Sequence, residues 1–348
     1  MLFYELACHP EVFNKEYLMD NDRAIKEIFR NITEKGSVAN LNNGKWELLI
    51  EEKIALLSND EAKEYKIKIQ LQTILKTLQT RKKMILHKEI ENEIDWLEII
   101  YADKDDFSII LNSLSTRDVY DAEDLLDSEL WDSITRTSSE YATQNEEYIK
   151  SEITPILHNA QQIDLIDPYF DITKNQYKKP FKIIINSLST KDSDKIIKLS
   201  IHIKNQNNNQ EDVIDRTNYL ERWQNFFNDY NDYNVNCTLY VWKETSTDTM
   251  HDRYIIRDES FCAVLPSGID ERKKNKTVWS DIGYHNIDSV LNDFRADSSP
   301  FKLVATVTVK DIYVIKKGIL QSKFKEANGI VEKNIDTKLG MRIKKRIR

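Results

Sequence analysis

Glycine is scarce in this chain, with only 7 glycines among 348 residues, whereas globular proteins average about 7%. No two glycines stand at the spacing of a G-x-G-x-x-G fingerprint or of a P-loop. Both motifs need glycine because backbone N–H groups approach a phosphate closely there. The sequence therefore disfavours a dinucleotide-binding site of the Rossmann type and an ATPase site of the Walker type.

Cysteine is also rare, limited to Cys8, Cys237 and Cys262, with no C-x-x-C pair. This excludes a cysteine-rich zinc module and argues against a disulfide framework, so we expect three buried, reduced cysteines. No stretch approaches the roughly 18 apolar residues of a membrane span, and residues 1–13 lack the basic and apolar segments of a signal peptide. We expect a cytoplasmic protein with no membrane partner.

The charges are unevenly distributed, although the formal net charge of −8 is ordinary. Residues 101–150 hold 13 acidic and 4 basic residues, whereas residues 301–348 hold 4 acidic and 13 basic residues and end in MRIKKRIR. Such a basic tail is able to contact nucleic-acid phosphates without sequence preference. Two other interpretations stay open: a solvated terminus, or a strap that neutralises the acidic segment of its own chain.

The first part of the chain, 1–112, is predicted to be a mainly helical α/β domain of unknown role. A short strand is expected at 2–7 and a helix over 22–32, and apolar residues with helical spacing predict amphipathic helices between 45 and 92. Residues 113–148 are acidic and rich in Ser and Thr, which predicts a connecting region with one or two short helices.

The second part, 149–317, is predicted to be an α/β domain with a mixed sheet. Strand-like and helix-like segments alternate there, and the last segments are consecutive strands, of which 301–315 is read as one. Residues 318–348 are predicted to be a basic C-terminal tail.

One segment, 251–258, carries the pattern of a chemical site. His251, Arg253 and Asp258 stand in an H-x-R-x4-D arrangement, and on a strand His251 and Arg253 would share one face. An imidazole beside a guanidinium suits attack on a phosphodiester. The forked N–H groups of arginine bind the non-bridging oxygens, and the neutral ring nitrogen is a nucleophile.

This pattern resembles the H-x-K-x4-D motif of the phospholipase D superfamily, with Arg253 in place of the usual lysine. The family's G-S-x-N-like turn has a degenerate, slightly shifted counterpart in P-S-G-I-D, residues 266–270. The upstream L-I-D-P-Y-F-D, residues 165–171, is similar to the first strand of a branch that combines a DPYF element with H-x-R and is common in bacterial defence-associated proteins. The resemblance covers roughly 140–310 and leaves the N-terminal part unexplained.

The resemblance implies a phospholipase D-like domain that needs no metal or other cofactor. His251 would be the nucleophile, Arg253 the phosphate clamp and Asp258 the orienting carboxylate, while Ser267 and Asp270 would contact the substrate. The superfamily mechanism uses two histidines, so a chain with one motif is expected to act as a homodimer whose twofold axis passes near both copies of His251.

Several other residues are candidates for a role. Asp167 is predicted to lie beside the substrate because strand ends line crevices in such sheets, although an Asp-Pro turn is an equal alternative. A second copy of the motif at His202-Ile203-Lys204 is rejected because a regular strand with outward His and Lys explains it. Asp167 and Asp171 alone are too few ligands for a metal site. The aromatic residues at 223–233 are expected to pack in the core rather than stack on bases.

Two functions are therefore carried forward. The first is a metal-independent phosphodiesterase, most simply a nuclease, acting through a phosphohistidine at a homodimer interface, with antiphage defence as the role that the resemblance implies. A lipid substrate is disfavoured, because no membrane-docking segment accompanies the motif. The second is a catalytically inactive module that binds a phosphate-bearing ligand, while the N-terminal helices dock a partner protein. The lysine-to-arginine exchange and the degenerate turn favour this second function.

Overall fold

The computed structural model groups the chain into two compact units. The first comprises Met1–Ser139 with Glu259–Phe261, and the second comprises Glu140–Asp258 with Cys262–Arg348. The expected connecting region, 113–148, is thus divided between the two units. The structure describes residues 2–41, 44–86, 100, 107–116, 118–172, 174–188, 196–205, 217–230, 234–271, 276–295, 297–310, 312–316, 319–326 and 329–334.

The first unit is built on a parallel sheet with the strand order β3-β2-β1-β4. All residues of β1, β2 and β4 are buried, the polar Glu5, Ser37 and Asn40 included, as expected of a parallel sheet covered on both faces. The strands are β1 (Tyr4–Cys8), β2 (Gly36–Asn40), β3 (Met84–Leu86) and β4 (Ile109–Leu111). The helices are η1 (Pro10–Phe13), α1 (Lys15–Lys35), α2 (Lys45–Ala55), α3 (Ala62–Thr80), α5 (Ala122–Leu126) and α6 (Glu129–Thr135).

The expected first strand, the helix over 22–32 and the helices after 45 are all present, but one boundary was predicted wrongly. Residues 84–86 were read as helical and instead form β3. Helix α3 ends at Thr80, and Lys82 then adopts a left-handed backbone conformation with φ of 54°, which breaks the helix. The short apolar run that follows pairs with β2.

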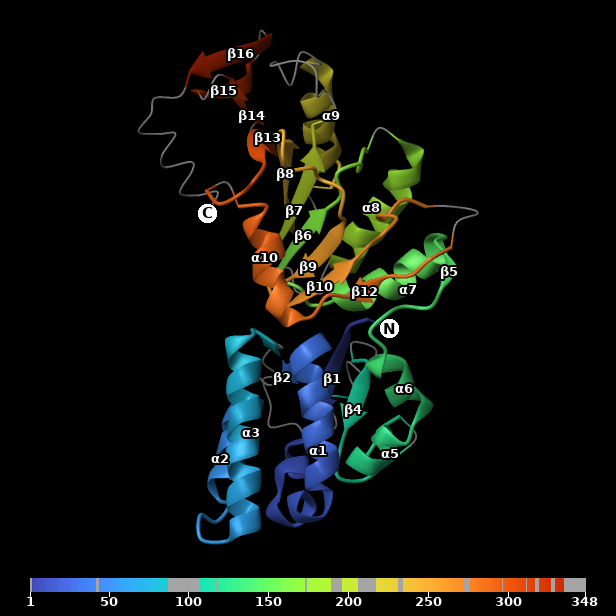
Figure 1. The fold of residues 1–348 in the computed structure, drawn as a ribbon, viewed down its shortest axis with the longest axis vertical. Helices are drawn as coiled ribbons and strands as arrows, with labels where there is room; N and C mark the ends of the chain where they lie inside the picture. Colours follow the sequence, from blue (N-terminus) through green and yellow to red (C-terminus); the bar gives the residue numbers. More distant parts are fainter. Residues whose placement is uncertain are drawn as a thin grey trace. The chain divides into compact units, whose positions relative to one another are not determined.

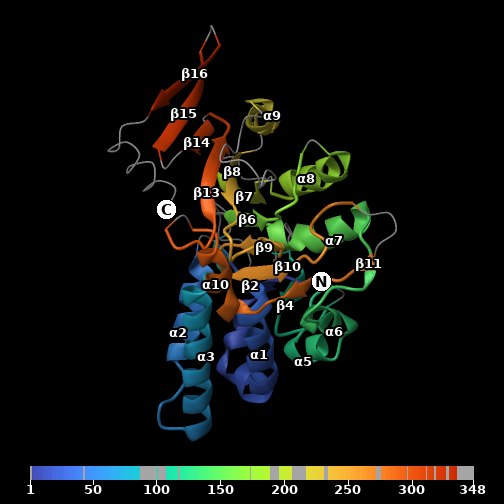
Figure 2. The same cartoon turned by 45° about the horizontal axis from the view of Figure 1, so that its top comes forward.

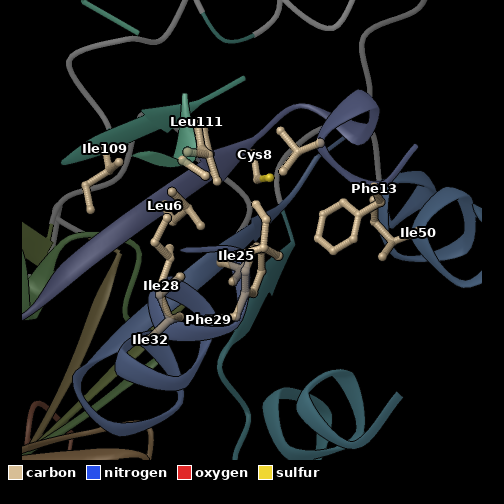
Figure 3. Close-up of a cluster of buried hydrophobic side chains, with 14 of the residues drawn as sticks. Leu6, Cys8, Phe13, Ile25, Ile28, Phe29, Ile32, Ile50, Ile109 and Leu111 are labelled. Carbon is tan, nitrogen blue, oxygen red and sulfur yellow. The ribbon is translucent and has the colours of Figure 1, made fainter. Parts of the chain in front are cut away.

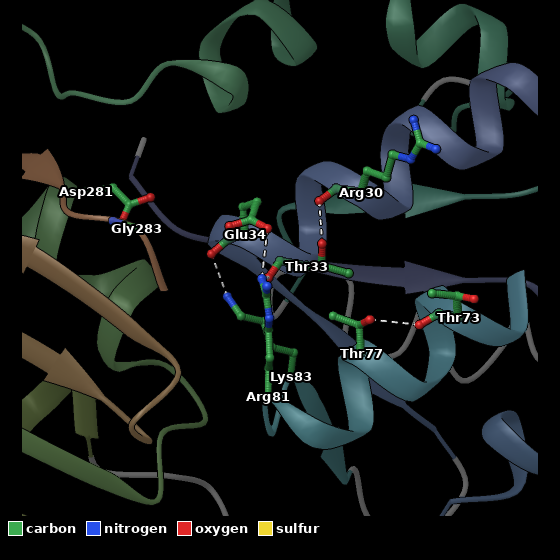
Figure 4. Close-up of polar contacts among 9 residues, drawn as sticks. All are labelled: Arg30, Thr33, Glu34, Thr73, Thr77, Arg81, Lys83, Asp281 and Gly283. Carbon is green, nitrogen blue, oxygen red and sulfur yellow. Dashed lines mark hydrogen bonds and ion pairs between the residues drawn. The ribbon is translucent and has the colours of Figure 1, made fainter. Parts of the chain in front are cut away.

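The core of the first unit forms between β1 and one face of α1 (Figure 3). Ile25, Ile28, Phe29 and Ile32 follow the i, i+3, i+4, i+7 spacing and are almost completely buried. The carboxyl end of α1 is closed by two cations from the segment after α3 (Figure 4). Arg81 Nη1 donates to Thr33 O at 2.9 Å, and the buried Lys83 Nζ donates to Glu34 O at 2.8 Å, where the helix dipole favours positive charge.

The second unit is built on a mixed sheet with the order β12-β10-β9-β6-β7-β8-β13-β14-β15-β16. Strands β6, β7 and β8 are parallel, and β9 runs antiparallel to β6 on its other side. Its strands are β6 (Gln162–Ile166), β7 (Ile197–Lys204), β8 (Val235–Lys243), β9 (Tyr254–Arg257), β10 (Phe261–Val264), β12 (Ser280–Asp281), β13 (Lys302–Thr308), β14 (Ile312–Lys316), β15 (Ile319–Glu326) and β16 (Gly329–Asn334), with β5 (Ala142–Thr143) and β11 (Lys276–Thr277) as a separate pair.

Helices lie on both faces of this sheet (Figures 1 and 2). Helices α7 and α8 lie on one side, and α10 lies on the other, where Ile287 and Leu291 pack against Ile166 and Ile256. The helices are α7 (Glu146–Leu157), α8 (Asn175–Leu188), α9 (Thr217–Asn228), η4 (Tyr284–Asn286) and α10 (Ile287–Asn292). The prediction of a mixed α/β fold is confirmed at this level.

The prediction of one strand over 301–315 is wrong, because this run contains two antiparallel neighbouring strands, β13 and β14. In the predicted basic tail, residues 319–326 and 329–334 form the strand pair β15–β16, and the MRIKKRIR ending lies outside the described residues. In the described part of the chain, no helix is both long enough and apolar enough to span a bilayer.

Candidate functional site

The DPYF element follows β6 directly and turns the chain away from the sheet. Asp167 is fully buried, and its Oδ1 accepts a hydrogen bond from the Tyr169 N–H at 3.0 Å. This aspartate turn, followed by a proline without an N–H, ends strand pairing at Ile166. Phe170 is buried against Tyr177 and Phe181, so the element is anchored in the core under α8.

Arg253 comes from the segment that precedes β9 and lies against this element. Its Nε is 3.3 Å from Asp167 Oδ1, and its Nη1 donates to Pro266 O. The guanidinium carbon lies 4.8 Å from the centre of the Tyr169 ring, a cation–π arrangement. Among the described residues Nη2 has no hydrogen-bond partner, so its two N–H groups remain available.

His251 contacts Tyr169 as well. Its Nδ1 is 3.2 Å from the Tyr169 hydroxyl, and the imidazole is exposed to solvent. Tyr169 therefore contacts both members of the H-x-R pair, with its hydroxyl on one and its ring face on the other. The sequence predicted that the DPYF element lies near the motif, but it assigned no role to Tyr169, because an aromatic residue after Asp-Pro has no signature of its own.

A tight turn, 266–271, closes the other side of Arg253. Gly268 has φ of +71°, and a Cβ there would overlap Asp167 Oδ2 and lie 2.9 Å from Arg253 Cδ. The buried Gln144 amide donates to Gly268 O at 2.9 Å and to Asp270 O at 2.8 Å. The turn is thus held rigidly against the ion pair, and only glycine fits at its centre.

The predicted strand geometry of the motif is wrong. His251 and Arg253 are not on a strand, because β9 starts at Tyr254, opposite Ile166, the last residue of β6. The pairing of β9 with β6 ends there, so residues 251–253 have no partner on β6. The two side chains nevertheless come together, because both contact Tyr169 rather than because they alternate along a strand.

Asp258 is not brought to His251, and the orienting role predicted for it is wrong. The register pairs Tyr254 with Ile166 and Arg257 with Ile163, so Asp258 lies beyond the opposite end of β9, a strand of about 13 Å. There Asp258 Oδ1 accepts the N–H groups of Gln161 and Gln162 at 2.9 and 2.8 Å. Asp258 thus fastens the start of β6.

The three predicted substrate contacts lie near Arg253 or in the turn beside it. Asp167 is fully buried against Arg253 in an aspartate turn, and Asp270 is 5% exposed, with Gln176 Nε2 3.3 Å from Asp270 Oδ2. Their contact with a substrate stays a prediction. Ser267 is half-buried in the same turn.

These buried acids influence one another. Burial raises the pKa of Asp167 to about 6; the Tyr169 N–H and the Arg253 guanidinium oppose this rise, and the Asp270 carboxylate adds to it. Burial, together with the Asp167 and Asp270 carboxylates, also raises the pKa of the Tyr177 phenol. The Arg253 guanidinium is thus the positive charge that acts on Asp167, while the nearby Asp270 carboxylate acts against it.

His202, in the rejected second motif, belongs to a buried network and not to the surface. Only 5% of the residue is exposed, so its predicted outward orientation is wrong. Its Nδ1 accepts from Trp242 Nε1 at 3.1 Å, its Nε2 is 3.5 Å from Asp164 Oδ1, and its ring stacks on Tyr240. These contacts use both ring nitrogens, which supports the rejection.

The remaining expectations concern cysteines, aromatic residues and metals. The three cysteines are free and buried, as predicted. Trp223 and Phe227 of α9 are buried in the core, as predicted, whereas Tyr233 lies outside the described residues. Within the ranges given above, no three His, Cys, Asp or Glu side chains are grouped as ligands for a metal ion.

Comparison with known proteins adds no family assignment. No protein-family model matches the sequence, and neither does any curated protein. The resemblance to the phospholipase D superfamily therefore rests on the short sequence elements alone, and the chemistry open to the chain is set by the geometry of Tyr169, His251 and Arg253.

Proposed function

We propose that this chain is a phosphodiesterase of the phospholipase D type, a nuclease that requires no metal and works as a homodimer in the cytoplasm. One observation carries the proposal: a single tyrosine, Tyr169, contacts an exposed imidazole through its hydroxyl and a guanidinium through its ring face. Two sequence elements about 80 residues apart converge to make this pair, which is the arrangement that attack on a phosphodiester needs.

The proposed reaction begins at Nε2 of His251. When the Nδ1 proton is donated to the Tyr169 hydroxyl, Nε2 keeps its lone pair and attacks phosphorus. The N–P bond forms as the P–O bond to the leaving group breaks, and the free Nη2 group of Arg253 binds a non-bridging oxygen. The leaving alkoxide takes a proton from the imidazolium of His251 of the second copy.

The second half of the reaction reverses these roles. Water attacks phosphorus while the imidazole of the second copy accepts its proton, and the N–P bond breaks to restore His251. The reaction needs a second copy of the chain, because among the described residues no other histidine contacts His251. The basic C-terminal residues would add contacts to nucleic-acid phosphates that do not depend on sequence.

A defined assay tests this proposal. Hydrolysis of bis(4-nitrophenyl) phosphate, single-stranded and double-stranded DNA, and RNA is measured in excess EDTA. We expect turnover by the wild-type chain, loss of at least about 1,000-fold in His251→Ala, and a smaller loss in Arg253→Ala. His285→Ala removes an exposed histidine of the same unit and is the matched control, with unchanged activity. Activity that persists in purified His251→Ala would rule out the proposal.

A second function is favoured by a specific observation. The charge of Arg253 is opposed by a fully buried carboxylate, Asp167, which weakens a phosphate clamp and suits a binding module without turnover. In that case the N-terminal unit would dock a partner protein of a larger defence assembly. The same variants separate the two functions: a phosphate-bearing probe would bind wild type and His251→Ala equally, would fail to bind Arg253→Ala, and would not be cleaved.

A further inference from the structure

A largely shielded ion pair lies at the ends of β7 and β8. Lys204 is the last residue of β7, and Glu244 follows the last residue of β8. Lys204 Nζ is 2.5 Å from Glu244 Oε2, with only 17% and 9% of the two side chains exposed. Removing one partner of such a shielded pair is costly, because little solvent reaches the charge that is left.

The second oxygen of Glu244 fixes the backbone next to His251. Glu244 Oε1 accepts the N–H of Met250 at 2.8 Å, and the Met250 side chain is buried. His251 is the next residue, and it lies outside any strand, so no ladder hydrogen bond holds it. The Glu244 carboxylate therefore anchors the segment on the amino side of His251, and the Leu265 N–H, which donates to Arg253 O at 2.8 Å, anchors it on the carboxyl side.

The backbone of Lys204 fixes the other partner of His251. Its N–H donates to Pro168 O at 3.2 Å, and Pro168 precedes Tyr169, whose hydroxyl lies 3.2 Å from His251 Nδ1. These contacts close a ring, which we call the contact ring. Its members are Pro168, Tyr169, Lys204, Glu244, Met250 and His251.

From this ring we propose that Lys204 and Glu244 are positioning residues for His251, which deepens the proposed function and rests on it. Lys204 holds the Tyr169 side of the ring through its N–H and the His251 side through Glu244. Loss of the ammonium removes the cation at Glu244 Oε2, which weakens the hold of Glu244 on the Met250 N–H and lets His251 move away from Tyr169. Displacement by about 1 Å is enough to slow a reaction about 100-fold.

A competing role for Lys204 is direct contact with the substrate phosphate. The two roles give opposite results in Glu244→Gln, which keeps an oxygen for the Met250 N–H but removes the charge that holds Lys204. If Lys204 contacts phosphate, releasing it lowers KM. If the pair positions His251, kcat falls and KM stays constant, because the substrate contacts are unchanged.

The experiment combines kinetics with NMR on the full chain. The nuclear Overhauser effect between the Tyr169 and His251 rings is measured with labelled histidine and tyrosine, alongside kcat and KM for bis(4-nitrophenyl) phosphate. We expect Lys204→Met and Glu244→Gln to lose this effect and about 10- to 100-fold in kcat, with KM unchanged. Lys204→Arg should restore both. Lys26→Met, which breaks the similarly shielded pair of Lys26 with Asp22 in the first unit, is the matched control without effect.

Each outcome has a clear meaning. An intact Tyr169–His251 effect in folded Glu244→Gln overturns the inference, even if Lys204→Met fails to fold. A change in KM alone also overturns it and assigns Lys204 to the substrate. If the wild-type chain shows no turnover, the proposed phosphodiesterase fails, but loss of the ring contact in Glu244→Gln with recovery in Lys204→Arg would still support the positioning role.

Discussion

At the scale of single residues, the site depends on the groups that stabilise the buried carboxylate of Asp167. Asp167 is fully buried, and its neighbours are a backbone N–H, one guanidinium and a turn that has no side chain at its centre. Because Gly268 lacks a Cβ, the 266–271 turn can lie directly against the ion pair. The orientation of Arg253 against Tyr169 therefore depends on a residue that makes no hydrogen bond to it.

This arrangement predicts the effect of Gly268→Ala. A Cβ at this position must displace Asp167 Oδ2 and Arg253 Cδ, and the residue must also keep a positive φ. We expect a loss of about 2–4 kcal/mol in the free energy of unfolding, measured by urea denaturation. We also expect Arg253 to leave the Tyr169 ring, with loss of phosphodiesterase activity or phosphate binding.

Gly283 provides the control for this substitution. Its φ is +76°, and a Cβ there would meet nothing within 4 Å. Gly283→Ala should therefore show only the cost of the backbone conformation, about 1–2 kcal/mol, and unchanged activity. If both variants lose activity equally, the close approach of Gly268 to Asp167 has no role in the site.

At the scale of elements, the relation of β6 to β9 decides what belongs to the site. The two strands are antiparallel, so Arg253 arrives at the carboxyl end of β6 while Asp258 arrives at its amino end. The DPYF element follows the carboxyl end of β6, next to Arg253. At the second end, Asp258 receives two backbone N–H groups and lies beside the buried Arg257.

We therefore predict that Asp258→Ala lowers stability but not catalysis. Loss of the carboxylate leaves the Gln161 and Gln162 N–H groups without their acceptor and places alanine at a φ of +50°, which should cost about 2 kcal/mol. The rate per folded molecule should stay within about twofold of wild type. Asp258→Asn, which keeps an oxygen and tolerates positive φ, should recover most of the stability. A 100-fold loss of kcat in folded Asp258→Ala would instead restore Asp258 to the catalytic group.

Much of the second unit could be predicted from local patterns, and the failures have a common cause. Strands β6, β7 and β8 follow from buried apolar alternation, and the DPYF element was expected near His251. The start of β9 was missed because it depends on where β6 ends, which no local pattern in 251–257 reveals. Lys204 was read as an outward strand residue, since its partner Glu244 lies 40 positions away and carries no signature of its own.

At the scale of the whole molecule, the question is how one chain supplies two histidines. His251 is exposed and contacts no second histidine among the described residues, while His202 is held by Asp164 and Trp242. A reaction that needs an imidazole nucleophile and an imidazolium acid must then draw the second ring from another copy. The oligomeric state and the chemistry are therefore linked, and one experiment can test both.

Mixing wild-type chain with His251→Ala makes this link measurable. If each reaction uses one histidine from each copy, only dimers of two wild-type chains turn over. Co-refolding equal amounts should then leave about a quarter of the activity of the same total amount of wild-type chain, and the activity should follow the square of the wild-type fraction. If single chains act alone, about half the activity remains and the dependence is linear. Mixing with His285→Ala should leave the activity unchanged, which controls for refolding. Sedimentation at the assay concentration shows whether dimers are present, so that a linear dependence from a dimer would reject the shared site without rejecting the catalytic role of His251.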